Sequence, residues 1–517
     1  MKNNPLVLTF DCGTQSIRAL IFDQQGNLLA KEQKSFTPYY SLKPGYTEQK
    51  PEVYREALKE VSLAIHANNP NLVSDIIAVT ITTIRDTCVC LDKQGQPLRD
   101  IIVWLDQREA KCEKKMPFMS EALFTVAGMK EAIEDQRKIT KSNWLIENEP
   151  ELWAKTDKYV MFSTYMISLL TEKIIDSSAS QIGHVPYDFK NKVWYKPNHF
   201  KFPIFNVPVE KLPPIIEPGQ TLGHISKEAA QEFGLMEGLP LVATGSDKGC
   251  ETLGTGVLDS SMASLSFGTT ATIQTTTRQY IEPVQFMPAY PGVAPGTYNP
   301  EIQIYRGFWM VSWFKKEFAA KEVEEAKKLK VAPEQLLNER LREIPAGSDG
   351  LILQPYWAPL LKSPEAKGSI IGFSGEHTRI HIYKAIIEGI GFGLIEGLNN
   401  LEKRLHHKIK ALTVSGGGSQ SDEICQITAD MFGLPVHKIQ TYEACGLGSS
   451  LVAFVALGIH PDYESAVKAM VHYTKTFMPD SKTHKTYDRL YKNVYRSIYP
   501  ALKPLYRELR KFAKERE

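Results

Sequence analysis

The chain has 517 residues, of which 43% are hydrophobic and 23% are charged, and its formal net charge at pH 7 is +2. Because single hydrophobic cores stop growing near ~250–300 residues, this length indicates more than one domain, and the ordinary composition excludes a largely disordered chain. The near-neutral charge excludes a nucleic-acid footprint, since the dense basic run "YRELRKFAKERE" alternates with acids and is typical of a solvated terminal helix.

The cysteines and the amino-terminal residues bear on the compartment. Seven cysteines are scattered along the chain with no paired C-x-x-C spacing, which indicates free thiols in a reducing environment. The opening run "MKNNPLVLTF" is too short and too polar for a signal peptide, and no apolar run approaches the ~20 residues that span a bilayer. We therefore expect a cytoplasmic protein with no membrane partner.

The first half of the chain predicts strands followed by helices. Three short runs, "PLVLTFD", "IRALIFD" and "LLAKEQKSF", predict a β-meander, and residues 51–67 have helical periodicity. The β-branched run "IIAVTITTI" predicts a buried strand with "TCVCLD" as its hairpin partner. Residues 141–171 predict a mostly helical stretch. This order favours an α/β domain.

The second half repeats the opening pattern near residue 265. Residues 239–256 predict a strand that ends in a glycine-rich turn, and residues 260–277 predict two strands joined by Gly-Thr-Thr. Residues 411–433 predict a strand, a glycine turn and a helix that starts near Ser421. The small residues of "ACGLGSSLVAFVALG" predict a helix that packs closely.

The repeat predicts an α/β fold of two related domains that face a cleft, the usual place for a small-molecule site. We predict the boundary in "GVLDSSM", so that one domain covers residues 1–258 and the second covers residues 259–465. Residues 466–517 are expected to form a helical tail.

The turn at residues 11–16, Asp-Cys-Gly-Thr-Gln-Ser, is the first candidate site. A glycine in such a turn lets backbone N–H groups approach an anion, the side chains of Thr14, Gln15 and Ser16 add donors, and Arg18 adds a positive charge nearby. Asp11 repels phosphate, so its presence makes sense if a divalent cation or its water shell lies between them. An Asx-type turn is the structural alternative.

Two further glycine turns suit a nucleotide. Gly268-Thr269-Thr270 has the same strand–turn–strand setting as the first turn, so two facing loops are expected to grip one polyphosphate. Gly416-Gly417-Gly418 precedes Ser421, and consecutive glycines before a helix suit a flat base or a phosphate. This loop resembles the dinucleotide fingerprint, but it lies late in the chain and opens no βαβ unit, so a dehydrogenase ranks last.

Polar residues at strand ends are the substrate candidates. Asp247, in a glycine-flanked turn, is a candidate base for a hydroxyl, with a turn-capping role as the alternative. Arg85-Asp86 is suited to neighbouring hydroxyls of a polyol or sugar, with a structural salt bridge as the alternative. Trp104 is expected to form an apolar wall against a carbon chain or to belong to the core, and Asp106 lies two residues on.

Together these stretches resemble the FGGY family of carbohydrate kinases, from about residue 6 to about residue 460. The resemblance is carried by "FDCGTQSIRALIFD", "PGYTEQKPEVY", "IVWLDQR", "GSIIGFSGEHTRIHIYKAIIEG" and "SGGGSQSDEICQITADMFGLPV". It implies two ribonuclease-H-like domains of the actin–hexokinase superfamily that close on ATP. It also implies transfer of a phosphoryl group to a sugar, ketose or polyol, and a homodimer.

The resemblance implies a role for each candidate. Asp11 would hold the Mg²⁺ shell, and Asp247 would be the base. The phosphates would lie between two sets of residues, Thr14, Gln15 and Ser16 on one side and Gly268 and Thr269 on the other. The adenosine would meet Gly417, Gly418 and Ser421.

The substrate stays open at this point. "TTIRDT" is similar to the stretch of glycerol kinases that has Arg-Glu, but here the acid is the shorter Asp86. Lys248 stands where glycerol kinases carry glutamine and pentulose kinases often carry asparagine, so it is expected to meet an acidic substrate group or to pair with a carboxylate. The alternatives are a glycerol kinase-like activity and a non-catalytic ATP-binding regulatory protein.

Overall fold

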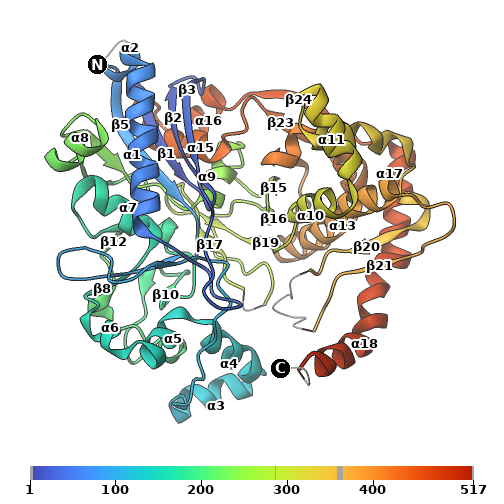
Figure 1. The fold of residues 1–517 in the computed structure, drawn as a ribbon, viewed down its shortest axis with the longest axis horizontal. Helices are drawn as coiled ribbons and strands as arrows, with labels where there is room; N and C mark the ends of the chain where they lie inside the picture. The colour runs from blue at the N-terminus through green and yellow to red at the C-terminus, as the bar shows by residue number, and fades with distance from the viewer. Residues whose placement is uncertain (1–3, 286, 358–364, 515–517) are drawn as a thin grey trace.

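Two six-stranded sheets with the same connectivity form the framework of the protein (Figure 1). The computed structural model describes residues 4–285, 287–357 and 365–514. The first sheet has the strand order β13-β14-β5-β1-β2-β3, and the second has the order β19-β16-β15-β22-β23-β24. In each sheet an antiparallel meander of three strands continues into two parallel strands and an antiparallel edge strand. This repeat confirms the predicted α/β class.

The strands β1, β2, β3, β5, β14, β15, β16 and β22 follow the predicted runs, whereas β13, β19, β23 and β24 were not predicted. The first sheet consists of β1 (Leu6–Cys12), β2 (Ser16–Asp23), β3 (Leu28–Ser35), β5 (Ile76–Thr83), β13 (Thr221–His224) and β14 (Pro240–Val242). The second consists of β15 (Met262–Phe267), β16 (Ala271–Gln274), β19 (Glu301–Ile304), β22 (Ala411–Ser415), β23 (Val436–Ile439) and β24 (Tyr473–Phe477). The position of the predicted domain boundary stays a prediction.

The central strand β1 is buried on both faces, and its successive side chains point alternately to one face and to the other. In β1, Leu8 and Phe10 pack toward helices α1 (Pro51–Asn68) and α7 (Phe162–Thr171). Val7, which lies between Leu6 and Leu8, points to the opposite face and packs with residues of α15 (Ala444–Ala456). A strand covered on both faces is mostly apolar, which explains the hydrophobic run Leu6–Leu8 and Phe10 in β1.

Helix α15 belongs by sequence to the second half of the chain but packs on the first sheet, beside α9 (Asp247–Gly254). Two glycines permit this approach. A Cβ on Gly448 would lie 1.9 Å from the Cys250 carbonyl oxygen, and a Cβ on Gly254 would lie 2.0 Å from that of Ala444. The predicted close packing of the small-residue helix is therefore confirmed, and α9 lies between the two sheets (Figure 1).

The second sheet carries the larger core. Its strands pack against α13 (Arg379–Leu405) and α14 (Asp422–Phe432). Tyr487 of α17 (Ser481–Leu490), Tyr491 and Tyr495 of the π-helical turn that follows, and Ile498 of α18 (Arg496–Lys514) join the same cluster. The segment predicted as a purely helical tail also contains β24, the edge strand of this sheet.

Two local predictions were wrong. The run "TCVCLD" is not the hairpin partner of β5, because β1 and β14 occupy both edges of that strand. It forms β6 (Cys88–Leu91) in a separate four-stranded sheet with β4 (Glu48–Gln49), β7 (Ile101–Ile102) and β8 (Lys158–Met161). The stretch 141–171 is likewise interrupted by β8, so it is helix, strand and helix.

The remaining elements surround this framework. The other helices are α2 (Pro70–Val73), α3 (Phe118–Val126), α4 (Lys130–Ile139), α5 (Lys141–Asn148), α6 (Pro150–Lys155), α8 (Lys227–Phe233), α10 (Trp309–Phe318), α11 (Ala320–Leu329), α12 (Pro333–Glu339) and α16 (Tyr463–Met470). The other strands are β9 (Asp176–Ser177), β10 (Tyr187–Asp188), β11 (Val193–Trp194), β12 (Ile215–Ile216), β17 (Tyr290–Pro291), β18 (Tyr298–Asn299), β20 (Ile352–Gln354) and β21 (Ser369–Ile371). Within the described ranges, no helix combines the length and apolarity needed to cross a membrane.

Candidate active site

The first glycine turn joins β1 to β2, as predicted, and is closed by a bond from the Gly13 N–H to the Ser16 carbonyl. Gln15 is exposed at its tip, whereas Ser16 is buried. The Thr14 Oγ1 accepts a 3.0 Å hydrogen bond from the indole Nε1 of Trp104. The structure therefore brings a predicted phosphate residue into contact with a predicted substrate residue.

Asp11 lies at the end of β1 with 4% of its surface exposed, and its Oδ2 accepts a 2.8 Å bond from Arg18. Arg18 also lies 3.6 Å from Glu443, which Lys31 contacts at 2.5 Å. Burial raises the pKa of Asp11 to about 6, although Arg18 opposes the rise, and the negative charges of Glu443 and Asp247 add to it. The carboxylates of Asp11 and Asp247 are therefore close enough to repel each other.

The second turn, Gly268-Thr269-Thr270, joins β15 to β16 in the same setting. Its carbonyls are anchored by the start of α10: Gly268 accepts from the Phe308 N–H and Thr269 accepts from the Trp309 N–H. The Thr270 hydroxyl donates to the Tyr305 carbonyl. Because the carbonyls are held on one side, the turn has a fixed backbone that can present its N–H groups to an anion.

The third loop packs directly on the second turn. Gly416 has φ +79°, and a Cβ there would lie 2.9 Å from the carbonyl carbon of Phe267. A Cβ on Gly418 would lie 2.4 Å from the Phe308 ring, whereas the space beside Gly417 is open. The backbone conformation therefore favours glycine at position 416, and close packing requires it at position 418. Gly417 leaves an open surface.

The loop leads into α14 as predicted, with Ser421 as its N-cap. The Ser421 hydroxyl accepts from the Ile424 N–H at 3.3 Å and donates to Glu423 at 3.0 Å. The free N–H groups and the positive end of the helix dipole therefore lie next to the glycine loop, an arrangement that suits a phosphate or a polar nucleotide group.

Asp247 does not lie in a turn, which corrects the prediction: it is the first residue of α9. Ser246 caps this helix by accepting from the Gly249 N–H. The Asp247 Oδ1 accepts from the Lys248 N–H at 2.8 Å and lies 3.8 Å from the Arg85 Nε. Burial raises the pKa of Asp247, against the opposing charges of Lys248 and Arg85. Packing of α9 against α15 explains why a glycine-rich sequence is helical here.

Arg85 and Asp86 do not pair with each other. Arg85 donates two bonds, of 2.8 and 2.9 Å, to the carboxylate of Glu301, and its guanidinium lies 5.5 Å from the centroid of the Tyr290 ring. Glu301 is buried in β19. Sequence reasoning missed Glu301, since a lone acid within a strand carries no motif.

Asp86 has a left-handed backbone, with φ 49°, and pairs with His184. The two carboxylate oxygens lie 3.0 and 2.8 Å from the His184 Nδ1, and the His184 N–H donates to the Oδ1 at 2.9 Å. Burial disfavours the charged carboxylate, but the histidine contacts prevail and hold the pKa of Asp86 below its usual range. His184 was also missed, because it lies on a different segment with no motif of its own.

Asp106 is buried, and its carboxylate accepts from the Thr47 N–H and three times from Arg108. Its hydrogen-bonding capacity is therefore used within this network. Trp104, two residues earlier, reaches Thr14 as described above. Of the two, the structure brings Trp104 to the first turn, and the substrate role of Asp106 stays a prediction.

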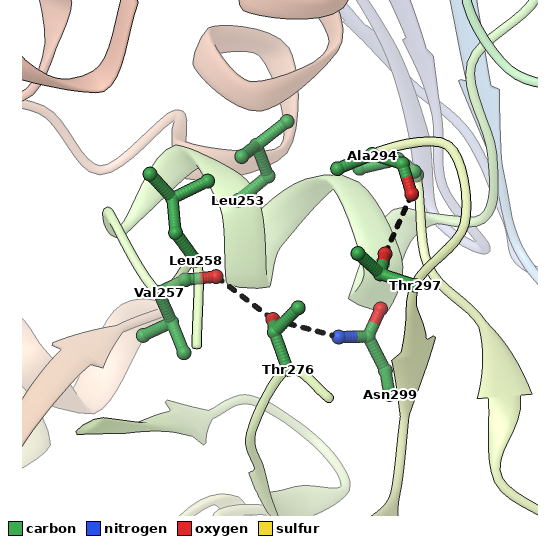
Figure 2. A pocket seen from close by; sticks show the side chains of 9 residues that line it. Leu253, Val257, Leu258, Thr276, Ala294, Thr297 and Asn299 are labelled. Atoms are coloured by element: carbon green, nitrogen blue, oxygen red, sulfur yellow. Dashed lines mark hydrogen bonds between the residues drawn. The ribbon is translucent and has the colours of Figure 1, made fainter. Parts of the chain in front are cut away.

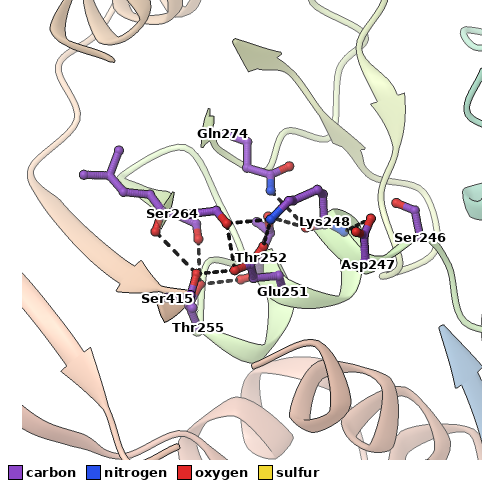
Figure 3. Close-up of polar contacts among 12 residues, drawn as sticks. Ser246, Asp247, Lys248, Glu251, Thr252, Thr255, Ser264, Gln274 and Ser415 are labelled. Carbon is purple, nitrogen blue, oxygen red and sulfur yellow. Dashed lines mark hydrogen bonds and ion pairs between the residues drawn. The ribbon is translucent and has the colours of Figure 1, made fainter. Parts of the chain in front are cut away.

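Lys248 pairs with a carboxylate, one of the two predicted outcomes. Its Nζ donates to Glu251 at 2.6 Å and to the Ser266 hydroxyl at 2.5 Å. The other Glu251 oxygen accepts from Ser266 at 2.9 Å and from Ser415 at 2.6 Å. Figure 3 shows Lys248, Glu251 and Ser415 converging beside α9.

A small cavity lies behind α9 but is not the active site (Figure 2). Its volume is about 10 Å³, which is room for one water at most. Its polar walls are already bonded: Thr276 donates to the Val257 carbonyl, and Thr297 donates to the Ala294 carbonyl. A sugar or a nucleotide cannot enter it.

Two sheets of this topology, each opening on a glycine turn, with an acid at the start of a helix between them, form a two-domain fold of the actin–hexokinase type. Residues 6–254 match the N-terminal domain of the FGGY family of carbohydrate kinases, and residues 263–457 match its C-terminal domain. The chain belongs to this family, which confirms the resemblance seen in the sequence.

Relatives of known sequence and structure cover nearly the whole chain. The xylulose kinase of Lactococcus lactis is 27% identical over 94% of this chain and 95% of its own. The gluconokinase of Bacillus subtilis is 24% identical over 94% of each. The gluconate kinase structure from Lactobacillus acidophilus has a TM-score of 0.82 at 23% identity, and covers 98% of this chain and 100% of its own. The protein is therefore a carbohydrate kinase that uses ATP as phosphoryl donor.

Proposed function

We propose that Asp247 takes the proton from the substrate hydroxyl that receives the phosphoryl group. The observation that carries this proposal is its position, at the start of α9, 3.8 Å from Arg85 and within electrostatic range of Asp11. A raised pKa brings a carboxylate closer to the range in which a general base works well. Such a base typically contributes ~10²–10⁴-fold to the rate.

The three glycine loops are proposed to hold ATP. Thr14, Gln15 and Ser16 would face the terminal phosphate from the first domain, with Gly268 and Thr269 opposite them. Gly417, Gly418 and Ser421 would meet the adenosine, which the open surface at Gly417 and the capped start of α14 support. Asp11 and Glu443 already compensate the charge of Arg18. We therefore propose that Arg18 orients Asp11 beside the phosphates.

Asp11 is the proposed ligand for Mg²⁺ or its water shell. Its Oδ2 bonds Arg18, which leaves the Oδ1 for a water of the metal. Among the residues that the structure describes, no group of three or more His, Cys, Asp or Glu side chains forms a metal cage. One carboxylate fits Mg²⁺, which is commonly bound by one or two carboxylates together with substrate phosphates and waters. When bound, the ion would neutralise charge on the phosphates.

A neutral ketose or polyol is the proposed substrate, in preference to a sugar acid. The guanidinium of Arg85 is committed to the buried Glu301, and Asp86 is held by His184. Burial, together with the negative charges of Asp86 and Glu301, raises the pKa of Tyr305, whose hydroxyl and ring suit a sugar. Trp104, which donates to Thr14, adds a second ring. An anion would meet Asp86 and Asp247 with Arg85 already paired, at a considerable electrostatic cost.

Two expectations from the sequence remain proposals. The scattered thiols suggest a cytoplasmic location, and the family suggests a homodimer. The alternative of a regulatory protein without catalysis is disfavoured by the presence of both Asp11 and Asp247.

ADP release tests the proposed function. The wild type is assayed against matched ketoses, polyols, glycerol and aldonates, with Asp247→Asn in parallel. We expect turnover of a neutral substrate and a loss of at least about 100-fold in the variant. Turnover of aldonates alone would refute the substrate class, and equal activity of the variant would refute the base.

A further inference from the structure

Lys248 lies where the base, the second turn and the third loop meet. It follows Asp247 in α9, and its side chain is 16% exposed. Its Nζ lies 3.9 Å from the position that a Cβ on Gly268 would occupy. The ammonium group is therefore directly beneath the turn proposed to hold the terminal phosphate.

Hydrogen bonds to buried polar side chains fix the position of this ammonium group. Glu251 is 3% exposed, and it accepts from Lys248, Ser266 and Ser415. Ser266 lies two residues before Gly268 in β15, and Ser415 immediately precedes Gly416 at the end of β22. One carboxylate thus ties the base helix to the two strands that lead into the nucleotide loops.

Two of the three N–H donors of the ammonium group are used, by Glu251 and Ser266. The third N–H is available on a side chain that keeps some exposure. Burial favours the neutral amine, but the negative charges of Glu251 and Asp247 outweigh it and raise the pKa of Lys248. The group therefore stays protonated and acts as a cation, not as a proton carrier.

We propose that Lys248 binds the phosphoryl group during transfer, through the N–H that its protein partners leave free. This inference rests on the proposed function of Asp247 and the Gly268 turn. The substrate hydroxyl gives its proton to Asp247, and its oxygen forms a bond to the terminal phosphorus of ATP. The bond from that phosphorus to the bridging oxygen breaks, and ADP leaves with the electron pair. Lys248 keeps its protons and neutralises charge on the transferred group.

Nucleotide binding by Lys248→Gln tests the proposal independently of turnover. Dissociation constants are measured for ADP and for an ATP analogue with a non-hydrolysable β,γ link. Because a hydrogen bond to a charged group contributes ~1.5–3 kcal/mol, we expect the analogue to bind about 10- to 100-fold more weakly, with ADP changed less than about threefold. Lys248→Arg should recover part of the affinity for the analogue.

Lys408→Gln is the control: Lys408 also donates at 2.6 Å to a mostly buried carboxylate, that of Glu402 near the end of α13, but its own side chain is 82% exposed. It should change neither constant. If Lys248→Gln fails to fold, Ser266→Ala replaces it; this change leaves the charge but loosens the ammonium group, and should weaken the analogue selectively by about threefold or more.

The outcomes separate the two proposals. Equal weakening of ADP and the analogue, or no weakening of either, would overturn the role of Lys248 while wild-type turnover leaves the kinase chemistry intact. A wild type that binds neither nucleotide and turns over no member of the substrate panel would overturn the proposed function itself.

Discussion

Replacing Glu301 by glutamine removes the charge that holds Arg85 next to Asp247. Arg85 donates two bonds, of 2.8 and 2.9 Å, to this carboxylate, whose side chain is 1% exposed. Breaking a buried ion pair on one side costs about 3–5 kcal/mol, because the remaining charge is left uncompensated. Asp247, 3.8 Å from the same guanidinium, offsets part of the loss, so we expect the lower end, about 3 kcal/mol.

Thermal unfolding and steady-state kinetics measure this loss. At roughly 2–4 °C per kcal/mol for a domain of this size, the melting temperature of Glu301→Gln should fall by about 6–12 °C. Glu217→Gln is the control, because Glu217 is 41% exposed and lies 3.3 Å from Lys192, where an ion pair contributes about 1 kcal/mol or less.

The kinetics of Glu301→Gln should show a higher KM for a neutral sugar, with the KM for ATP less affected. The freed guanidinium should at the same time improve the use of an aldonate relative to the neutral sugar. A melting temperature within the range of the Glu217→Gln control, together with an unchanged preference between the two substrates, would refute the reasoning.

Three further predictions follow from the contacts and pKa directions. Burial raises the pKa of Asp11 from 3.8 to about 6, so its contribution to stability is fully present below pH 3.8 and is lost as the pH rises through 6. Asp11→Asn should flatten that part of a curve of stability against pH. In the wild type, the KM for Mg²⁺–ATP should rise as the pH falls through about 6, because the Asp11 carboxylate becomes protonated. Gly418→Ala places a Cβ 2.4 Å from the Phe308 ring and should lower the melting temperature, whereas Gly417→Ala meets open space and should not; equal melting temperatures would contradict this packing. In Gly448→Ala the new Cβ would lie 1.9 Å from the Cys250 carbonyl oxygen of α9, so the variant should lower the free energy of unfolding by about 3 kcal/mol. Gly375→Ala, whose Cβ would meet no atom within 4 Å, provides the control in the same melting experiment.

The parts that sequence reasoning predicted well are local. The turn at residues 11–16 lies between two apolar runs whose bounds match β1 and β2, because a tight turn between strands is specified by a few neighbouring residues. Ser421 was predicted as the start of α14 for the same reason, since a hydroxyl before a periodic segment satisfies its free N–H groups.

The predictions that were wrong concern segments whose structure depends on partners distant in the sequence. Residues 247–254 read as a turn because two glycines weaken a helix, and packing of α9 against the glycines of α15 reverses that preference. The strand β6 was paired with β5 on the basis of adjacency, but β14, which comes much later in the chain, takes that edge.

The sequence by itself determined the class of protein through its resemblance to the FGGY family, which is carried by short stretches such as the first glycine turn and the third glycine loop before a capped helix. Only the tertiary structure decided which charges are free and which are paired. Glu301 beside Arg85 and His184 beside Asp86 come from distant segments that could not be recognised beforehand. For Lys248 the structure decided between two predicted outcomes, in favour of pairing with Glu251. The reason is physical. A motif consists of residues that are neighbours in the sequence, whereas the electrostatic energy of a buried charge depends on the side chains that the fold places within about 4 Å of it.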